Sequence, residues 1–397
     1  MSIEKAIQDI KAGKMVIVVD DEKRENEGDL VCAAQKVTPE IINFMTKFGR
    51  GLVCAPLESK RLDELLIDDM VIKNTENTGC CFTVSVDYKF NTTTGISAYD
   101  RALTIQKLVD KKSKPQDFLR PGHIFPLRAR DGGVLERAGH TEAAVDLAKL
   151  AGLYPAGVIC EIMSDDGGMA KLNELEKFAK KYKMEIVKID QLIAYRMMHE
   201  NVVTQVQKVN FPTDFGIFKL AVFENNITKE NALAIIKGNI SGKENVLARI
   251  HSSCETGDIF HSQRCDCGDQ LGGALKKIDQ KGEGVLLYLH QEGRGIGLVN
   301  KIKAYALQEK GYDTVDANVK LGFDKDLRDY FFASQIFKLL KVKSLDLMTN
   351  NPAKIEGLKK YGIKVSKRTE LEIAPKSSNE KYMKTKKEKM GHMLKKI

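Results

Sequence analysis

The first half of the chain alternates amphipathic stretches with short apolar runs. After Ser2, a residue type that often caps helices, apolar side chains recur at helical spacing over residues 3–10, and Gly13 ends the pattern. Residues 15–19 then form an unbroken apolar run, which is typical of a buried strand. Because this alternation continues as far as Ile193, we predict a domain of mixed α and β structure.

A long polar segment separates the first two predicted strands. Residues 20–29 are almost wholly polar, and the apolar pattern resumes at residues 30–34. Since a charged loop cannot bury its backbone groups, we expect this segment at the surface or at a functional site. The run Thr38-Pro39-Glu40 then opens a predicted helix, because proline is favoured in the first helical turn.

The pattern weakens near residue 200 and then restarts. Residues 197–210 are polar with little periodic signal, and we place a domain boundary there. Predicted strands and helical patterns follow at residues 216–223, 285–289, 304–307, 331–340 and 345–348. We therefore predict a mixed α/β and α+β fold of two globular domains, each a sheet flanked by helices. The domains would be residues 1–199 and 200–397, with a basic tail from about residue 376.

The composition is that of a soluble globular protein, with 43% hydrophobic and 29% charged residues. No apolar run approaches the roughly 18 residues of a membrane span. Charged residues interrupt the first twenty positions, which is unlike a signal peptide. We therefore predict a cytoplasmic protein with no membrane association. Its eight cysteines are then reduced thiols or metal ligands.

The net charge of +9 favours anionic ligands but does not distinguish nucleotides, sugar phosphates and nucleic acid. Part of this excess lies in the tail, where seven lysines oppose only Glu380 and Glu388. They are Lys381, Lys384, Lys386, Lys387, Lys389, Lys395 and Lys396. We interpret the tail as a solvated terminal helix or a frayed end rather than a nucleic-acid-binding arm.

Three cysteines with the spacing Cys254-x10-Cys265-x-Cys267 form the most informative pattern. Thiolates are strong zinc ligands, and three protein ligands leave the fourth tetrahedral position open for water. Such a water loses its proton far more easily than bulk water and becomes a hydroxide nucleophile near neutral pH. His251 or His261 as a fourth ligand would instead close the site and make it structural. A third possibility is that the three cysteines are buried near one another by coincidence and bind no metal.

The segment 291–297 has the composition of a phosphate-binding turn after a predicted strand. Its glycines permit close approach of the backbone to phosphate, and Arg294 adds a charged fork. Glu292 offers two acceptors for the edge of a guanine ring. Thr349 and Lys354, which follow another predicted strand, supply a hydroxyl and an ammonium for further phosphate contacts.

Residues 24–29 place three carboxylates and an arginine within six positions. Close carboxylates repel one another, so this loop suits a divalent cation or a basic partner, although a solvated acidic turn has the same composition. His140 and Glu161 would complete an oxygen- and nitrogen-ligated metal site with Glu25. Residues 139–142 read as a turn that enters a helix, where exposed amide groups hold phosphate.

Several segments of the first half, in order along the chain, resemble 3,4-dihydroxy-2-butanone 4-phosphate synthase. They are RENEGDL (24–30), GRGLVC (49–54), FTVSVD (82–87), RPGHIFPL (120–127) and RAGHTEAAVDL (137–147). The resemblance covers residues 1–199. It implies conversion of ribulose 5-phosphate into a four-carbon phosphate and formate, with Mg²⁺ or Mn²⁺. Leu103 and the pair Cys80-Cys81 depart from the usual pattern of the family.

Matched by position, the resemblance assigns roles in this half. Glu25 and His140 would bind Mg²⁺ or Mn²⁺, and His123 and Glu161 would be catalytic. Enolisation beside a carbonyl needs a base, and a divalent ion stabilises the enediolate that develops. The residues implied in ribulose 5-phosphate binding are Arg24, Glu25, Asp29, Arg137, Ala138, Gly139, His140, Thr141 and Glu161.

Segments of the second half resemble GTP cyclohydrolase II over nearly all of residues 205–375. They are ARIHSSCETGD, HSQRCDCGDQL, YLHQEGRGIGL, NKIKAYALQ, LGFDKDLRDY and MTNNPAK. The resemblance implies release of formate and pyrophosphate from GTP, which gives a diaminopyrimidine ribose phosphate. Ser253 stands where an acidic residue is usual, and residues 331–335 replace a run of smaller side chains.

The same matching implies that Cys254, Cys265 and Cys267 bind zinc and that Mg²⁺ accompanies GTP. The implied GTP-binding residues are Arg249, Ile250, His251, Ser252, Ser253, Gln270, Glu292, Gly293, Arg294, Thr314, Thr349 and Lys354. Asp326 would accept a proton, Arg328 would attack the α-phosphate, and Tyr305 would support ring opening. Because a guanidinium is a poor nucleophile unless Asp326 removes a proton, charge stabilisation is the more conservative role for Arg328.

Two working halves are the leading hypothesis, because every matched metal and acid–base position is filled and the two products converge in riboflavin synthesis. The alternative is one active half with the other as a scaffold. A zinc-dependent nucleic-acid-binding protein is a third class. It would normally show paired CxxC sites or stacking aromatic residues, whereas aromatic residues make up 7% here and tryptophan is absent. The resemblance also implies a homodimer.

Overall fold

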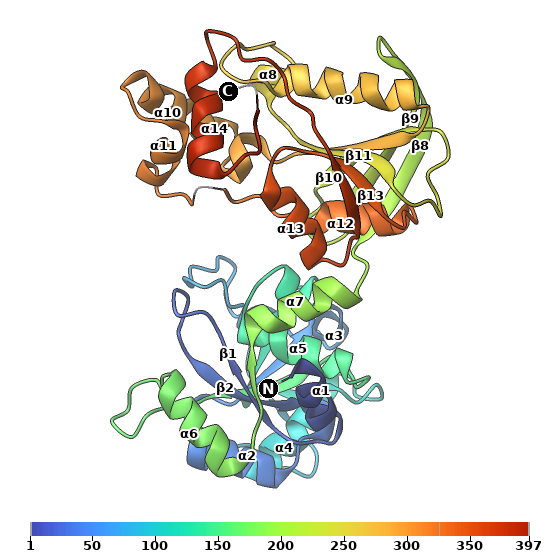
Figure 1. The fold of residues 1–397 in the computed structure, drawn as a ribbon. Coiled ribbons are helices and arrows are strands. Elements are labelled where there is room, and N and C mark those ends of the chain that lie inside the picture. The colour runs from blue at the N-terminus through green and yellow to red at the C-terminus, as the bar shows by residue number, and fades with distance from the viewer. Residues whose placement is uncertain (1, 325, 396–397) are drawn as a thin grey trace. The chain divides into compact units, whose positions relative to one another are not determined.

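The computed structural model describes residues 2–324 and 326–395 (Figure 1). The chain divides into two compact units, and the boundary falls between His199 and Glu200. Each unit contains its own seven-stranded sheet with helices against it, so the predicted fold class is confirmed. Within the described residues, every helix is too short or too polar to cross a membrane.

The first unit contains the following elements in chain order. They are α1 (Ile3–Lys11), β1 (Val16–Val19), β2 (Gly28–Ala33), η1 (Ala34–Lys36), α2 (Pro39–Phe44), η2 (Met45–Gly49), β3 (Cys54–Glu58), α3 (Ser59–Glu64), β4 (Val86–Tyr88), α4 (Ala98–Leu108), η3 (Pro115–Asp117), β5 (Phe118–Ala129), η4 (Gly133–Leu135), α5 (His140–Leu150), β6 (Gly157–Glu161), α6 (Leu172–Tyr182), β7 (Ile186–Lys188) and α7 (Ile189–His199).

Local signals in the sequence set the first of these elements. The Ser2 hydroxyl accepts a hydrogen bond from Lys5 N and caps α1, as predicted. Thr38 caps α2 in the same way, with Pro39 in the first turn. Strand β2 begins at Gly28, two residues before the predicted start, because the polar residues Gly28 and Asp29 pair with β1.

The sheet of the first unit is mixed, with the strand order β4-β5-β3-β6-β2-β1-β7. Strand β2 lies antiparallel between β1 and β6, and this register places Asp29 directly opposite Glu161. Helices cover both faces. Alternate residues of β1 and β2 therefore pack into two separate cores, one with α1, α5 and α7 and the other with α2, α3, α4 and α6.

The second unit contains the remaining elements. They are β8 (Val203–Thr213), β9 (Gly216–Asn225), β10 (Asn231–Lys237), β11 (Val246–Ser252), α8 (Glu255–Asp258), α9 (Cys267–Lys281), β12 (Gly284–Leu289), η5 (Glu292–Gly295), α10 (Gly297–Glu309), α11 (Thr314–Lys320), α12 (Phe331–Leu339), β13 (Leu345–Met348), α13 (Pro352–Lys360), β14 (Val365–Thr369) and α14 (Glu380–Met390).

The second sheet has the strand order β14-β13-β11-β12-β10-β9-β8. The neighbouring strands β13, β11 and β12 at its centre are parallel. The segments that connect them contain helices, as crossover connections between parallel strands usually do. Helix α9 packs Ala274, Leu275 and Ile278 against this sheet. Figure 1 shows α9 along one side of the sheet and α12 with α13 along the other.

The segment that we predicted to be an unpatterned boundary is largely structured. Helix α7 extends to His199, and β8 begins at Val203 and pairs with β9 along its length. The hydrophobic pattern is weak because β8 is an edge strand whose side chains from Thr204 to Asn210 are exposed. Pro212 lies within this strand, where an edge tolerates the loss of a backbone donor.

The basic tail also differs from its prediction. Residues 380–390 form α14, but the helix is not simply solvated, because Met383, Thr385 and Lys386 are buried. Contacts with α11 and with the loop before α9 account for this burial. The tail is therefore part of the second unit's packed structure.

Candidate active sites

The carboxyl ends of three parallel strands converge at one edge of the second sheet. Cys254 follows β11, Gln291 and η5 follow β12, and Thr349 follows β13. In open sheets of this kind, the loops at the carboxyl ends of the strands form the binding crevice. Segments almost a hundred residues apart in sequence are thereby brought to one place.

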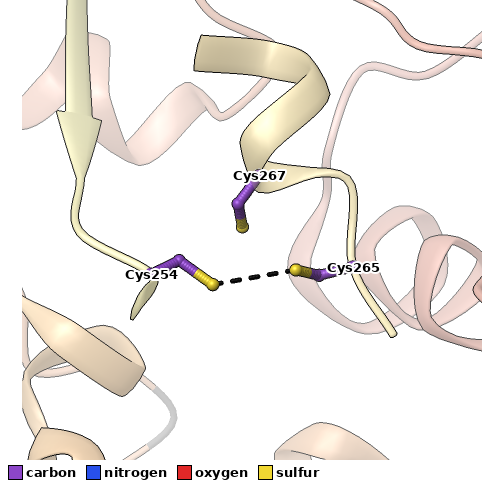
Figure 2. Close-up of side chains that lie close together, drawn as sticks. All are labelled: Cys254, Cys265 and Cys267. Atoms are coloured by element: carbon purple, nitrogen blue, oxygen red, sulfur yellow. Dashed lines mark hydrogen bonds between the residues drawn. The ribbon is translucent and has the colours of Figure 1, made fainter. Parts of the chain in front are cut away.

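Figure 2 shows the thiols of Cys254, Cys265 and Cys267 directed toward one another. All three Sγ atoms lie within 4.8 Å of each other, and those of Cys254 and Cys265 are 3.7 Å apart. A disulfide needs about 2.05 Å. Two sulfur atoms bound to one tetrahedral zinc at about 2.3 Å lie roughly 3.8 Å apart. The cluster therefore has the dimensions of a zinc site rather than of a disulfide.

Gly257 makes room for the thiol cluster. A Cβ atom at this position would lie 2.8 Å from Cys265 Sγ and 3.1 Å from Cys254 Sγ, closer than such atoms approach. The three sulfurs are therefore packed around a position where only hydrogen fits. Sequence analysis did not single out Gly257, because its role depends on contacts across the fold.

Lys301, on α10, is a further member of the site that sequence analysis missed. Its Nζ lies 3.1 Å from Cys254 Sγ and donates to Glu292 Oε1 at 2.7 Å and Thr256 Oγ1 at 2.9 Å. The neighbouring thiols and this ammonium together lower the pKa of Cys254 far below its usual range. The sequence did hold one signal for Lys301. It lies four residues before Tyr305, so the two side chains share one face of a helix.

Neither histidine that we considered as a fourth ligand joins the thiol cluster. His251 Nε2 contacts the Asp258 carboxylate at 3.1 Å, and its ring stacks on Tyr288. His261 is exposed. Among the described residues, the potential ligand group consists of the three cysteines alone. The arrangement thus favours three protein ligands with an open fourth position over a closed structural site.

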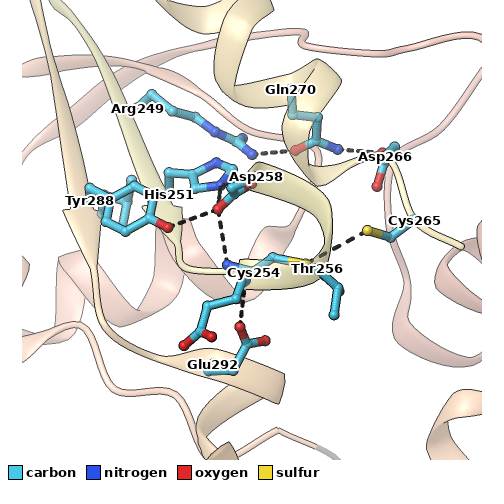
Figure 3. A network of polar contacts seen from close by, with 12 residues as sticks. Arg249, His251, Cys254, Thr256, Asp258, Cys265, Asp266, Gln270, Tyr288 and Glu292 are labelled. Atoms are coloured by element: carbon cyan, nitrogen blue, oxygen red, sulfur yellow. Dashed lines mark hydrogen bonds and ion pairs between the residues drawn. The ribbon is translucent and has the colours of Figure 1, made fainter. Parts of the chain in front are cut away.

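A polar network connects the thiol loop with the strands (Figure 3). Arg249 donates to Met348 O at 2.9 Å and to Gln270 Oε1, and Gln270 donates in turn to Asp266 Oδ2 at 2.5 Å. Asp258 accepts from Cys254 N at 2.9 Å and from the Tyr288 hydroxyl at 3.0 Å. These bonds fix the cysteine loop relative to β11 and β12.

A cavity of about 150 Å³ opens beside the thiols. It is lined by every GTP-site and catalytic residue predicted in this half except Ile250 and Asp326. Ile250 faces the core, but its carbonyl accepts a hydrogen bond from Lys354 Nζ at 2.7 Å. The fold therefore gathers residues 249–354 around one pocket, as the resemblance implied.

Three cations on this pocket, Arg249, Arg294 and Lys354, form no ion pair among the described residues, whereas Arg328 pairs with Asp326. Burial, with the charges of Arg249 and Arg328, lowers the pKa of Lys354 well below its usual range. Burial also lowers the pKa of Arg249 to about 10. The buried atoms Arg249 Nε and Arg294 Nη1 have no hydrogen-bond partner among the described residues. Because buried cations need compensation, the pocket is suited to an anionic ligand.

The turn after β12 is held in an unusual backbone conformation. Gly293 and Arg294 both have positive φ angles, 61° and 64°, which are uncommon for a residue with a side chain. Both oxygens of Glu292 already accept hydrogen bonds, from Glu255 N at 2.6 Å and from Gly293 N at 2.8 Å as well as from Lys301. Oε1 accepts from both Gly293 N and Lys301, whereas Oε2 accepts from Glu255 N alone and keeps a lone pair for a ligand.

Asp326 and Arg328 form a bidentate ion pair in a segment outside the helices and strands. Arg328 donates from Nε to Oδ1 at 2.8 Å and from Nη2 to Oδ2 at 2.5 Å. Burial opposes the charge of the guanidinium, but the bond to Asp326 outweighs it and raises the pKa of Arg328. Arg328 is thus held protonated, which favours charge stabilisation over nucleophilic attack.

The remaining predicted residues of this half also lie on the pocket. The Tyr305 hydroxyl lies 3.3 Å from Thr256 Oγ1 beside the thiol cluster. The Ser252 hydroxyl donates to Gln291 Oε1 at 3.1 Å, and Thr314 begins α11 on the opposite wall. Ser253, which replaces the usual acidic residue, is buried at the end of β11.

A second cluster lies in the first unit. Ligand atoms of Asp20, Glu25 and His140 lie within 4.8 Å of one another. Arg24 donates from Nη1 to Asp20 at 3.0 Å and to Glu25 at 2.7 Å, which fixes the polar loop, and Glu25 contacts His140 of α5 at 3.5 Å. His140 Nε2 is buried and has no hydrogen-bond partner in the part of the chain that the structure describes. Oxygen ligands with one imidazole suit Mg²⁺ or Mn²⁺. Sequence analysis missed Asp20, and Glu161, which we expected to complete this site, is not part of the group.

Charged groups on β2 and β6 interact electrostatically with this cluster. Burial lowers the pKa of His140, but the carboxylates of Asp29 and Glu25 outweigh it and raise the pKa to about 9. Burial and the nearby Glu161 raise the pKa of Asp29 to about 7. The Glu161 carboxylate accepts from Leu52 N at 2.8 Å. The cluster therefore concentrates negative charge that a divalent cation would compensate.

His123 is oriented by Asp87 rather than by the acidic cluster. Its Nδ1 lies 2.7 Å from Asp87 Oδ2, and its backbone N donates to Asp87 Oδ1 at 2.8 Å. Nearly half of the side chain is exposed. Within the described residues, no hydrogen bond joins His123 to Glu25 or His140. Sequence analysis did not identify the aspartate that orients this ring.

The predicted phosphate segment enters α5 without a side-chain cap. Gly139 precedes the helix in an extended conformation, so amide groups of the first turn have no side-chain acceptor. Arg137 is already engaged, because it donates to Glu142 at 2.6 Å and to Thr78 O at 3.0 Å. Thr141 lies 3.9 Å from the Cys80 thiol. A cavity of about 520 Å³, lined in part by Asp20, Arg24 and Ala138, opens beside the cluster of Asp20, Glu25 and His140.

Comparisons with known proteins match the two units of the chain to two different enzyme families. A family model for 3,4-dihydroxy-2-butanone 4-phosphate synthase matches residues 4–195, and one for GTP cyclohydrolase II matches residues 204–370. A riboflavin biosynthesis protein RibBA from Endomicrobium trichonymphae is 62% identical over 396 residues, which cover 100% of this chain and 98% of the relative. The chain belongs to this bifunctional family.

Other similar proteins also match this chain over most of its length. RibBA of Aquifex aeolicus is 56% identical over 99% of this chain and 98% of its own length. The crystal structure of RibBX, a two domain 3,4-dihydroxy-2-butanone 4-phosphate synthase from A. baumannii, superposes with a TM-score of 0.69 at 36% identity. It covers 93% of this chain and 99% of that one. The synthase and cyclohydrolase families are thus combined in one chain.

Proposed function

We propose that both units are active enzymes of riboflavin biosynthesis. The first unit converts D-ribulose 5-phosphate to 3,4-dihydroxy-2-butanone 4-phosphate and formate. The second hydrolyses GTP to 2,5-diamino-6-ribosylamino-pyrimidinone 5'-phosphate, formate and pyrophosphate. Membership of the family supports both activities.

The thiol cluster within a cationic pocket is the observation that carries the proposal for the second unit. Cys254, Cys265 and Cys267 would hold a zinc ion, which would supply a Lewis acid to activate water for attack on the purine. Glu292 accepts from the guanine edge through Oε2, which keeps one free lone pair. Arg249, Arg294 and Lys354 bind the triphosphate, which provides the negative charge that their buried groups lack.

Asp326 and Arg328 act on the phosphate side of the reaction. Because the ion pair keeps the guanidinium charged, Arg328 stabilises negative charge on the α-phosphate as pyrophosphate leaves. The Arg328 side chain reaches the pocket, whereas Asp326 supports it from behind. Tyr305, beside the thiols, orients the ring that opens.

In the first unit, Glu25 and His140 hold Mg²⁺ or Mn²⁺, with Asp20 as a further ligand. A divalent ion there supplies charge for stabilising an enediolate. Asp29 and Glu161 lie opposite each other across β2 and β6, and the raised pKa of Asp29 suits a group that exchanges a proton near neutral pH. Arg24 and the first turn of α5 bind the sugar phosphate.

Formate release measures both proposed reactions. Purified full-length protein, loaded with zinc and magnesium, is given GTP or ribulose 5-phosphate separately. We expect formate from each substrate and pyrophosphate from GTP only. Absence of formate with one substrate, while the other reacts, would show that only one unit works.

The alternative of one active unit has a specific motivation. RibBX also has two domains but is named for the synthase activity alone. In this chain, however, the three thiols, the unpaired cations and Arg328, which is held by Asp326, line one cavity of the second unit. These features support an active second unit rather than a scaffold.

We also propose a cytoplasmic homodimer that has no nucleic-acid partner. All eight cysteines are free thiols, as is usual in a reducing compartment. Met70, Val71 and Ile72 expose apolar side chains in one run, which favours a protein contact. Light scattering of the purified protein would determine whether it is a dimer.

A further inference from the structure

The C-terminal segment, residues 380–394, forms part of the wall of the nucleotide pocket. Tyr382, Lys386, Met390 and His392 line the same cavity as the three thiols. The cyclohydrolase family model ends at residue 370, so this wall comes from beyond the matched region. A segment that the sequence presents as a lysine-rich end therefore contacts the proposed chemistry.

One lysine of this segment is buried against the cysteine loop. Lys386 Nζ lies 2.6 Å from Asp266 Oδ1, and the side chains of Lys386 and Asp266 are 10% and 2% exposed. Asp266 stands between Cys265 and Cys267 and also accepts from Gln270. Because a buried carboxylate needs a counterion, Lys386 stabilises the conformation of the loop that carries two thiols.

Further contacts hold the segment in place. Lys389 pairs with Asp313 and, at 2.8 Å, with Asp316, which flank the start of α11. Met393 N donates to Asn350 O at 2.8 Å, beside the phosphate-side residue Thr349. Met383 and Leu394 are buried. The C-terminal part of the segment is thus anchored both to α11 and to the loop after β13.

His392 lies on the phosphate side of the cavity. Its Nε2 is buried without a hydrogen-bond partner among the described residues. Burial, with the nearby charges of Lys386 and Arg328, lowers the pKa of His392 to about 3, so the ring is neutral. Arg294 and Lys354 add to the same positive field. A neutral imidazole with an unused nitrogen therefore stands where an anion would be attracted.

We propose that residues 380–394 are a functional wall of the GTP site, in which His392 donates a hydrogen bond to the triphosphate and Lys386 positions the cysteine loop through Asp266. This inference rests on the proposed cyclohydrolase function. His392 contacts the ligand directly. Lys386 acts through Asp266 and is a positioning residue.

Inorganic pyrophosphate is the probe for His392. Its affinity for the zinc-loaded full-length protein is measured by calorimetry for wild type, His392→Leu and His392→Gln. We expect His392→Leu to weaken pyrophosphate binding roughly 10-fold, as befits one hydrogen bond to a charged group. It should raise KM for GTP similarly and leave kcat within about twofold. His392→Gln retains a donor and should recover part of the affinity.

The test of Lys386 separates kcat from KM. Lys386→Met leaves Asp266 buried without its counterion, and we expect kcat for GTP to fall roughly 10-fold or more. Zinc content should remain stoichiometric because the three thiols are unchanged. Adding Asp266→Asn to this variant should restore part of kcat, since no buried charge is then left unpaired. Lys384→Met on the exposed face of the same helix is the matched control and should behave as wild type.

The outcomes distinguish this inference from the function on which it rests. If wild type converts GTP but His392→Leu binds pyrophosphate as tightly or more tightly, the role of His392 is wrong and the cyclohydrolase assignment stands. Unchanged kcat in Lys386→Met would likewise exclude the positioning role. If wild type neither releases formate from GTP nor binds pyrophosphate, both proposals fail together.

Discussion

Lys301 and Cys254 are in direct contact, with 3.1 Å between Nζ and Sγ, although they come from different elements 47 residues apart. The same ammonium contacts Glu292 and Thr256. The proposed zinc ligand and the proposed guanine acceptor therefore share one buried cation. This connection makes the metal site and the base-recognition site electrostatically dependent on each other.

Lys301→Met tests this dependence. We expect GTP turnover to fall at least 10-fold, because removal of one partner leaves the Glu292 carboxylate buried and uncompensated. The steady-state kinetics of formate release measure the effect. Lys303→Met, at an exposed position on the same helix, serves as the control. Wild-type kinetics in Lys301→Met would exclude any functional role for the contact.

Removal of one thiol should separate the two activities. Cys265→Ser is expected to abolish the GTP reaction, because the zinc ion loses one of three ligands, and to leave the sugar-phosphate reaction unchanged. His140→Ala should produce the reverse pattern. Both variants are assayed for formate with each substrate, and bound zinc is measured by elemental analysis. Full GTP turnover by Cys265→Ser would disprove the zinc assignment.

Gly257→Ala should damage the metal site without touching a ligand. The added methyl group would lie 2.8 Å from Cys265 Sγ, so the thiols must separate. We expect zinc affinity to fall at least 10-fold, as measured by competition with a chromogenic chelator. Gly273→Ala on α9 is the control, because its added methyl group would meet Leu371 at an ordinary 3.6 Å. Equal zinc affinity in both variants would contradict the proposed packing.

A buried ion pair should stabilise the first unit. Arg196 contacts Asp146 at 2.7 Å, and the two side chains are almost fully buried. Removing one partner of such a pair costs about 3–5 kcal/mol, so Arg196→Met should lower the free energy of unfolding of this unit by that amount. Urea unfolding followed by circular dichroism measures it.

The exposed pair Lys5–Asp9 is the comparison for this measurement. Lys5→Ala should change stability by less than about 1 kcal/mol, since water screens the charges. An Arg196→Met variant as stable as Lys5→Ala would show that the buried pair contributes nothing.

Much of the fold followed from local patterns. The helices after Ser2 and Thr38 begin where the capping residues predicted, because an N-cap acts within one turn. Strand β8 was missed because period-two alternation appears only where one face of a strand is buried. Asp20 was missed because its approach to His140 depends on how the polar loop folds back on α5.

The sequence alone determined the chemistry available to this protein, namely three thiols at close spacing, the acidic loop near Glu25 and the glycine-rich turn at Arg294. Only the tertiary structure decided which groups meet. It placed Lys301 beside Cys254 and buried Lys386 against Asp266, 120 residues away in the chain. Residue type fixes what a side chain can bind, but its partners depend on packing between distant segments, which local patterns do not encode.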